Sequence, residues 1–315
     1  MNKEAKVLVL GGRGLVGSAI IRQLKKQGYE NILSPSRQEL NLLSQENTLQ
    51  YFFDHKPEFV FDAAAKVGGI QANNNYRADF IFQNLSIQNN TFEASFKSQI
   101  KKLLFLGSSC IYPKEAPQPI KEEYLLTGPL EPTNEPYAIA KIAGLKTAES
   151  FNRQYGCQYY SAMPTNLYGE GDNFHPENSH VIPGLIQRME TTIENGEKTF
   201  EVWGTGKPMR EFLYVDDMAE ACLFLMQYQG DQPHWINIGT GTDITIRELV
   251  ETVAEVMGFE GEFTFNTEKP DGMMRKVMDV SKINSLGWKA KTSLKEGIKK
   301  TVAFYKTHKN EVRRT

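Results

Sequence analysis

The sequence predicts an α/β protein: a doubly wound parallel sheet with a smaller, discontinuous α/β domain woven into it. Predominantly apolar runs at residues 7–10, 59–65 and 102–107 have the character of strands that are buried on both faces. A glycine-rich turn follows the first run and opens a helical pattern. The chain has 315 residues and 40% apolar content, enough for one large domain and a smaller one. We therefore expect a Rossmann-type fold.

Composition excludes several classes of function. The net charge of -2 and a pI near 6.3 provide no basic face for nucleic acid, so a small-molecule partner is expected. The run at 7–10 is too short for a signal sequence or a membrane span, and we expect a cytoplasmic protein. Cys110, Cys157 and Cys222 are odd in number and widely spaced, which indicates free thiols.

The first strand, 7–10, leads directly into a turn and then into a helix marked by Ala19, Ile20 and Leu24. The turn reads Gly11, Gly12, Arg13, Gly14, Leu15, Val16 and Gly17. Glycines let the backbone approach a pyrophosphate, which the amino end of the helix then faces. The Gly-x-x-Gly-x-x-Gly spacing is not the commoner Gly-x-Gly-x-x-Gly, and a purely structural turn is the alternative. Its place after a buried strand favours a dinucleotide site.

The second strand, 31–34, predicts which dinucleotide is bound. An NAD site normally has a carboxylate here against the adenosine ribose, whereas this chain reads Ser34, Pro35, Ser36 and Arg37. A guanidinium suits a 2'-phosphate, and Arg13 in the turn is a second candidate. The alternative is a solvated loop arginine. NADP is therefore favoured over NAD.

The next two strands place candidate groups at one edge of the sheet. The run at 59–65 ends in small residues, including Ala64 and Ala65, and a loop at 66–75 precedes a helix at about 79–97. The run at 102–107 is followed by Ser108, Ser109 and Cys110. Ligands of such sheets bind beyond the carboxyl ends of the strands, so chemistry is expected at these three residues.

Tyr137 and Lys141 are four residues apart on a predicted helix and share one face. A positive charge near a phenol favours the phenolate, so we expect Lys141 to lower the pKa of Tyr137. The alternative is an ordinary solvated helix edge. The sequence context favours a proton-transfer pair.

The remaining chain alternates strands, loops and helices. A strand at 161–163 leads into a loop at 164–169, and a polar loop at 172–183 with two histidines precedes an apolar helix. Residues 212–218 open a further helix, and 235–239 form a strand expected to return to the main sheet. Thr245 and Glu248 have the spacing of a capping box. We expect residues 1–168 with about 211–242 to bind the cofactor, and about 169–210 with 243–315 to bind substrate.

Together, the glycine turn, the strand-end Ser108 and the Tyr-x-x-x-Lys pair resemble the extended short-chain dehydrogenase/reductase superfamily. Four segments, 63–70, 106–113, 172–183 and 203–212, closely resemble the GDP-L-fucose synthase family, with a match from residue 6 to about 290. Glu170 stands where members often have proline, and Met273 with Met274 where Thr-Pro is common. These departures affect only loop shape or nucleotide fit.

The resemblance implies a reaction and roles for its residues. It implies NADPH-dependent 3,5-epimerisation and 4-keto reduction of GDP-4-dehydro-6-deoxy-D-mannose to GDP-L-fucose. Tyr137 would be the general acid or base, Lys141 would lower its pKa and bind the nicotinamide ribose, and Ser108 would bind the reacting oxygen. Cys110 and His180 would perform the epimerisation. The wider cofactor site would add the residues Asn41, Leu42, Ala64, Ala65, Leu106, Gly107, Ser109, Pro164, Thr165, Asn166, Leu167 and His180.

The resemblance also places the nucleotide and suggests assembly. Arg188, Trp203, Arg210 and Asp271 would contact the GDP moiety. Their alternatives are surface arginines and a core tryptophan. His175 is expected to be structural, and no metal site is expected because the two loop histidines lack further ligands. A homodimer through helices near 80–97 and 137–155 is implied.

Two other functions stay open at this point. The first is another nucleotide-sugar epimerase or dehydratase of the same superfamily with a tightly held NAD(P). A 4,6-dehydratase would need an acidic pair after Ser109, where this chain has Cys110. The second is a non-catalytic NADP-sensing regulator, but such proteins usually lose the tyrosine or the lysine. The epimerase-reductase interpretation is therefore favoured.

Overall fold

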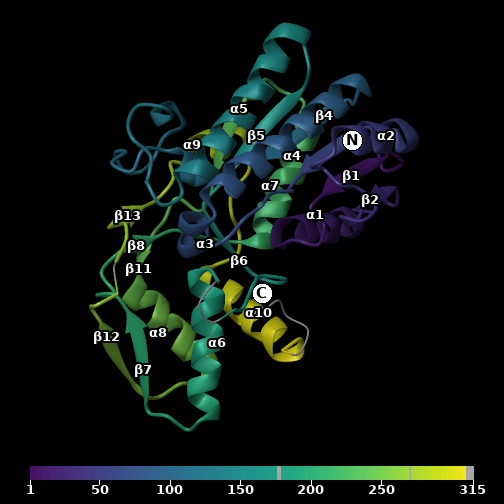
Figure 1. The fold of residues 1–315 in the computed structure, drawn as a ribbon. Coiled ribbons are helices and arrows are strands. Elements are labelled where there is room, and N and C mark those ends of the chain that lie inside the picture. The colour runs from purple at the N-terminus through teal and green to yellow at the C-terminus, as the bar shows by residue number, and fades with distance from the viewer. Residues whose placement is uncertain (176–178, 270, 310–315) are drawn as a thin grey trace.

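The computed structural model describes residues 1–175, 179–269 and 271–309. Its centre is a parallel sheet with the strand order β10-β5-β4-β3-β1-β2 (Figure 1). The strands are β1 (Val7–Leu10), β2 (Ile32–Leu33), β3 (Phe59–Asp62), β4 (Lys102–Leu106), β5 (Tyr159–Pro164) and β10 (Trp235–Ile238). The expected Rossmann-type sheet is confirmed, and the strand near 235 does return to it, beside β5.

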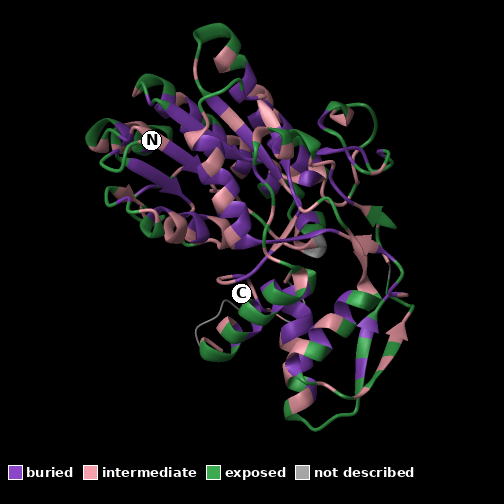
Figure 2. Ribbon diagram, turned by 180° about the vertical axis from the view of Figure 1, so that it is seen from behind, coloured by how far each residue is buried: buried purple, intermediate pink, exposed green. Residues whose placement is uncertain are grey.

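Helices cover both faces of this sheet because both faces of its strands are apolar. In β1, Val7 and Val9 face one core and Leu8 and Leu10 face the other, as the alternation of strand side chains requires. The first face carries α1 (Leu15–Lys26) and α7 (Val215–Gln227). The second carries α2 (Gln45–His55), α4 (Arg77–Lys97) and α5 (Glu135–Tyr155). Figure 2 shows the sheet as a buried layer between them.

A second core lies below the sheet in Figure 1. Its elements are α6 (Val181–Glu194), β7 (Thr199–Trp203), α8 (Ile246–Met257), β12 (Glu262–Asn266) and α10 (Leu294–Thr307). Strands β7 and β12 pair in parallel, and residues such as Met189, Val202 and Val253 fill the space between strands and helices. This arrangement is the smaller α/β unit that the fold class predicts.

Short strands and a short helix lie outside the main elements of the two cores. Strand β8 (Met209–Arg210) lies between β11 (Ile244–Thr245) and β13 (Arg275–Lys276). Helix α9 (Ser281–Leu286) lies later in the chain but packs Ile283 into the core of the large sheet. The predicted domain boundaries stay a prediction.

Three local predictions were wrong. Residues 166–168 are not loop but strand β6 (Asn166–Tyr168), which pairs with β9 (Phe212–Tyr214), so the helix predicted from 212 begins only at Val215. This pairing joins segments far apart in sequence, and neither has a local pattern. The predicted loop before α4 contains helix α3 (Ile70–Asn75). Its Asn73 side chain donates back to the Gly68 carbonyl at 2.7 Å, which ties the helix to the chain before it.

The remaining elements are two single turns of 3-10 helix, η1 (Ser109–Ile111) and η2 (Glu122–Tyr124). Among the helices described, none has the length and apolar character that crossing a bilayer requires. All three cysteines are free thiols, as expected.

Candidate active site

The glycine turn between β1 and α1 brings three backbone segments into close approach. Gly11 has a φ of 73°, and a Cβ there would lie 2.6 Å from the carbonyl oxygen of Ala63, just beyond β3. A Cβ on Gly17 would lie 2.2 Å from the Gly11 carbonyl oxygen. Gly14 is the N-cap of α1 and provides no side-chain cap, so the first backbone N–H groups of α1 have no side-chain acceptor there. This geometry suits an anion such as a pyrophosphate.

The predicted adenosine side lies after β2. Arg37 and Arg13 are both exposed, and Arg13 interacts electrostatically with Glu39. Glu39 accepts a hydrogen bond from the Ser36 backbone N–H at 2.7 Å, which shapes this loop. Asn41 is exposed, while the Leu42 carbonyl accepts a bond of 2.8 Å from Asn90 on α4. Arg37 of this loop and Arg13 of the glycine turn are therefore both presented to solvent.

The carboxyl ends of β3 and β4 place the other predicted cofactor residues side by side. Ala64 and Ala65 follow β3, which pairs with β4 in register at Asp62 and Phe105. Leu106 ends β4, and a Cβ on Gly107 would lie 2.2 Å from the sulfur of Met163 on β5. This close packing explains why a glycine follows β4. The strand-end predictions about position are confirmed.

Ser108 and Cys110 lie at the start of η1. Ser108 is the N-cap of that turn, and its Oγ accepts a hydrogen bond from the Cys110 backbone N–H at 3.3 Å. Ser109 is buried, whereas Ser108 and Cys110 are partly exposed. Both candidate side chains thus stay accessible beside the end of β4.

Tyr137 and Lys141 share a face of α5, with the Lys141 Nζ 5.8 Å from the centre of the Tyr137 ring. The prediction that Lys141 lowers the pKa of Tyr137 was wrong for this structure. Burial, followed by the charge of Cys110, raises the pKa of Tyr137. The ammonium instead donates to the Leu106 carbonyl at 2.7 Å, and burial lowers its own pKa to about 8. Desolvation of the phenol is therefore the main influence on its pKa.

Sequence reasoning missed Asp62, the last residue of β3. It is fully buried, its Oδ1 accepts from the Ala64 N–H at 3.2 Å, and its Oδ2 has no hydrogen-bond partner among the described residues. Burial raises the pKa of Asp62 to about 6, against the opposing charge of Lys141. An acidic residue within an otherwise apolar strand was the available signal.

Lys276 on β13 was also missed. Burial raises the pKa of Cys110, and the Lys276 ammonium is the largest of the influences that lower it, ahead of Ser108 and Lys141. Lys276 lies in register with Arg210 on β8, which links the thiol to the predicted nucleotide side. Only the strand pairing brings residue 276 to residue 110, so no local pattern could reveal it.

His180 is the N-cap of α6, and its side chain is 62% exposed. Its Nδ1 lies 3.8 Å from Oδ1 of Asp172, whose side chain is only 4% exposed. The contact with Asp172 raises the pKa of His180 against the effect of burial. Residues 176–178 of this polar loop lie outside the described residues. His175 is held through its backbone N–H, which donates to the Asn173 side chain at 3.0 Å.

The segment after β5 is fixed by the connection between β8 and β9. The Thr165 hydroxyl and the Asn166 amide both donate to the Glu211 carbonyl, at 3.4 and 2.8 Å. The buried Glu211 carboxylate accepts from the backbone N–H groups of Thr240, Gly241 and Met278, at 2.6, 2.7 and 2.8 Å. Pro164 and Leu167 flank these anchored residues and are partly buried. One residue, Glu211, thus ties the segments after β10 and β13 to the segment after β5, through its carboxylate and its carbonyl respectively.

The four predicted nucleotide contacts form two pairs. The Arg188 guanidinium stacks 4.3 Å from the Trp203 ring centre and donates to the Glu201 carbonyl at 3.1 Å. Trp203 is 40% exposed, and the Lys269 ammonium also lies over its ring, 5.6 Å from the centre. Arg210 interacts with Asp271, whose two oxygens each accept a 2.7 Å hydrogen bond from Thr205. These bonds lower the pKa of Asp271, which stays ionised.

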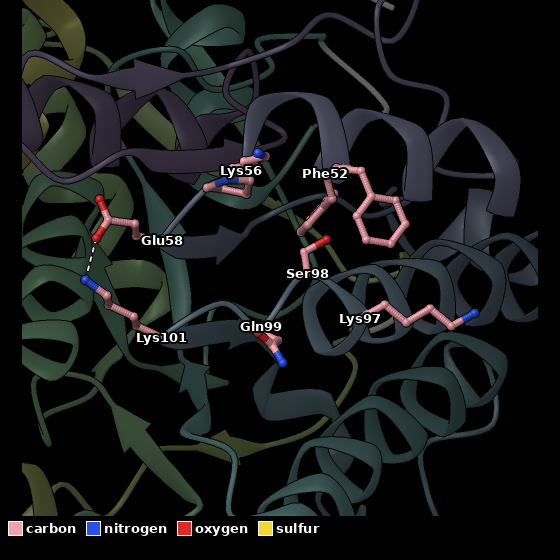
Figure 3. A pocket seen from close by; sticks show the side chains of 9 residues that line it. Phe52, Lys56, Glu58, Lys97, Ser98, Gln99 and Lys101 are labelled. Atoms are coloured by element: carbon pink, nitrogen blue, oxygen red, sulfur yellow. Dashed lines mark hydrogen bonds and ion pairs between the residues drawn. The ribbon is translucent and has the colours of Figure 1, made fainter.

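A separate groove lies at the opposite edge of the sheet (Figure 3). It is lined by segments that precede β3 and β4, including Lys56 and Glu58 from one and Gln99 and Lys101 from the other. These segments lie at the amino ends of the strands. The predicted site residues that follow strands lie at the opposite, carboxyl ends. Lys101 is ion-paired with Glu58, and the groove holds none of the candidate catalytic groups.

The carboxyl ends of the strands carry a glycine turn, a thiol, a phenol and an ammonium, which is the arrangement of an α/β nucleotide-binding enzyme. The chain belongs to the NAD dependent epimerase/dehydratase family, whose family model matches residues 7–239.

Individual relatives narrow this assignment. "Putative GDP-L-fucose synthase 2" of Arabidopsis thaliana is 55% identical over 97% of this chain and 93% of its own length. "GDP-L-fucose synthase" of Escherichia coli (strain K12) is 50% identical over 99% and 100%. The solved structure of a GDP-L-fucose synthetase from Naegleria fowleri bound to NADP has a TM-score of 0.93 at 29% identity, covering 100% of this chain and 96% of its own. These findings confirm the predicted family resemblance and enzyme class.

Proposed function

We propose that this chain converts GDP-4-dehydro-6-deoxy-D-mannose into GDP-L-fucose, by inversion at C3 and C5 and reduction of the C4 ketone. The observation that carries the proposal is that Lys141 donates to the Leu106 carbonyl at the end of β4, and the turn with Cys110 follows that same strand end. Groups suited to carbon acid chemistry and to carbonyl reduction are therefore adjacent. The relatives named above make the same product by name.

The glycine turn supports NADPH as the reductant. The spaces beside Gly11 and Gly17 exclude any Cβ, and α1 begins without a side-chain cap, which fits a pyrophosphate. Arg37 and Arg13 would hold the 2'-phosphate. Lys141 and the 164–167 segment would hold the nicotinamide end, and NADPH supplies the hydride when bound. The predicted cofactor residues keep these roles as proposals.

The chain's own residues provide the remaining chemistry. C3 and C5 are both adjacent to the C4 ketone, so loss of either proton builds charge on the C4 oxygen, where Tyr137 and Ser108 would stabilise it. Inversion needs a base on one face of the ring and an acid on the other, which are Cys110 and His180. The raised pKa of Tyr137 keeps the phenol protonated, as an acid for the reduction step requires. Lys276 favours the Cys110 thiolate.

The GDP moiety would be bound by the second set of residues. Arginine binds diphosphate through its fork of donors, and Arg188 and Arg210 would act in this way. Trp203 is a partly exposed ring beside Arg188 and Lys269, which would add apolar surface to this cationic site. Asp271 would accept from the ribose through lone pairs that Thr205 leaves available.

The deciding experiment incubates the protein with NADPH and the 4-keto sugar nucleotide and identifies the product by NMR. The parent should give GDP-L-fucose. Cys110→Ala should lose epimerisation but keep some direct C4 reduction, whereas the matched variant Cys157→Ala should behave as the parent. No reduction of the 4-keto sugar, together with inversion at C4 of a 4-hydroxy nucleotide sugar without net NADPH consumption, would instead support a nucleotide-sugar 4-epimerase. GDP-L-fucose from Cys110→Ala at the parental rate would remove Cys110 as the base.

We also propose a cytoplasmic homodimer. The free thiols support a reducing compartment, because Cys110 must stay reduced to act as a base. Exposed apolar side chains on α4 and α5, namely Phe82, Phe96, Ile139 and Tyr155, support an interface between copies of the chain.

A further inference from the structure

We infer that Asp172 is a positioning residue for His180, holding its Nδ1–H so that Nε2 is directed to the sugar and keeping the ring able to carry a proton. This inference rests on the proposed role of His180. It adds a residue to which no role has been given above. The geometry that carries it is a buried carboxylate at ion-pair distance from a largely exposed imidazole.

The two side chains in this contact differ in how far they are exposed. Asp172 is 4% exposed and His180 is 62% exposed, with 3.8 Å between Oδ1 and Nδ1. The carboxylate is therefore fixed in the protein, while the ring extends from it toward solvent. Hydrogen bonds between catalytic groups are often long before substrate binds and tighten afterwards.

The carboxylate is itself held at one oxygen and open at the other. Oδ1 accepts from the Asn173 backbone N–H at 2.8 Å, and the Asp172 N–H donates to the Gly169 carbonyl at 3.3 Å. Oδ2 is buried and has no hydrogen-bond partner among the described residues. The contact with the imidazole is made through Oδ1, so it rests on the negative charge that a fixed, buried carboxylate brings beside the ring.

The position of His180 at the start of α6 explains why a protonated ring needs a nearby negative charge. His180 is the N-cap of α6, where the partial positive charge of the helix dipole disfavours an imidazolium. The first turn of α6 has no acidic residue to offset that charge. In the described part of the chain, Asp172 is the ionisable group that interacts with His180. Cys110, Tyr137, Lys141 and Lys276 belong to the same proposed site and are kept unchanged in the test.

The acid and base roles then follow without any added reagent. As an acid, imidazolium gives its Nε2 proton to the carbanionic carbon, and the neutral ring keeps its Nδ1–H toward Asp172. As a base, the neutral ring takes a proton at Nε2, and the resulting cation is stabilised by the carboxylate. The same relation serves both directions of proton transfer.

The first test is a ¹⁵N NMR titration of the imidazoles in the whole protein, with the His180 signal identified by its loss in His180→Gln. In the parent, neutral His180 should be the Nδ1–H tautomer and should titrate above the usual value of about 6.5. An Nε2–H tautomer would overturn the inference without any variant of Asp172. In Asp172→Asn, the His180 pKa should fall because the neighbouring negative charge is lost.

The second test separates positioning from folding. Deuterium exchange from solvent into the sugar at C3 and C5 should slow at least tenfold in Asp172→Asn, while direct C4 reduction stays within about threefold. Asp172→Glu should restore much of the exchange. Glu170→Gln is the matched control, because it removes one negative charge from the same loop, where Glu170 pairs with Arg22 at 3.7 Å. Exchange at the parental rate in Asp172→Asn, or an equal loss in Glu170→Gln, would contradict the inference.

Discussion

Asp62 and Lys141 are opposite charges that are both buried, at the end of β3 and on α5. Neither finds an ideal partner, since the ammonium donates to a carbonyl and one carboxylate oxygen is unpaired among the described residues. Desolvation therefore acts on both, raising the pKa of Asp62 to about 6 and lowering that of Lys141 to about 8. Their mutual attraction limits both shifts.

Asp62→Asn should stabilise the protein and alter its pH profile. Because the folded pKa of Asp62 lies above its unfolded value of 3.8, its ionised form destabilises the fold, fully so above pH 6. We expect a gain of at most about 3 kcal/mol at pH 8 that disappears toward pH 4. The change also removes the negative charge that helps Lys141 to keep its proton, so the pKa of Lys141 should fall. The rate of C4 reduction should then begin to decline at a lower pH on the alkaline side.

Urea unfolding at several pH values and the pH dependence of kcat/KM for reduction would measure both effects. Asp79→Asn is the matched control, because Asp79 forms an exposed ion pair with Lys66 and should change stability by less than about 1 kcal/mol. Lower stability of Asp62→Asn at pH 8 would contradict the account of a costly buried charge.

Arg37→Ala should discriminate between the two nicotinamide cofactors. An arginine-phosphate contact contributes about 1.5–3 kcal/mol, so the KM for NADPH should rise by about tenfold or more while that for NADH changes little. Arg153→Ala, an exposed arginine paired with Glu149 on α5, is the control. Equal changes in the two KM values would remove Arg37 from the 2'-phosphate site.

At the scale of elements, α8 shows a predicted feature that can be tested. Thr245 accepts from the Glu248 N–H at 3.1 Å and Glu248 accepts from the Thr245 N–H at 2.8 Å, so the predicted capping box is confirmed. Thr245→Ala should cost about 1 kcal/mol in urea unfolding because it leaves a helix N–H without its acceptor. Thr252→Ala, in the middle of the same helix, should be neutral or slightly stabilising. Equal losses would argue against the cap.

At the scale of the whole molecule, α4 and α5 lie together with apolar side chains exposed on both. Phe82 on α4 is 71% exposed and Ile139 on α5 is 40% exposed. The double change Phe82→Lys with Ile139→Lys should convert a particle of twice 35.7 kDa into a single chain in size-exclusion chromatography with light scattering. Phe53→Lys, on α2, should leave the mass unchanged. A parent that already elutes as one chain would refute the homodimer.

Local signals were enough for the central sheet and the order of its strands along the chain. The runs that form β1, β3 and β4 are apolar because both faces are covered, and their ends could be located from the small and polar residues that follow. Tyr137 and Lys141 were predictable as neighbours because helix geometry fixes them within one turn. The β6–β9 pair was not predictable, because its partners are separated by the whole of the α6 and β7 region.

The sequence by itself thus determined the doubly wound sheet, the glycine turn and the set of reactive residue types, since each depends on contacts within a few positions. Only the tertiary structure decided which charges act on those residues. Lys276 reaches the environment of Cys110 through strand pairing, Asp172 reaches His180 across a loop, and burial reverses the expected direction of the Tyr137 pKa. Desolvation and long-range charge depend on what surrounds a side chain in three dimensions, which spacing along the chain does not encode.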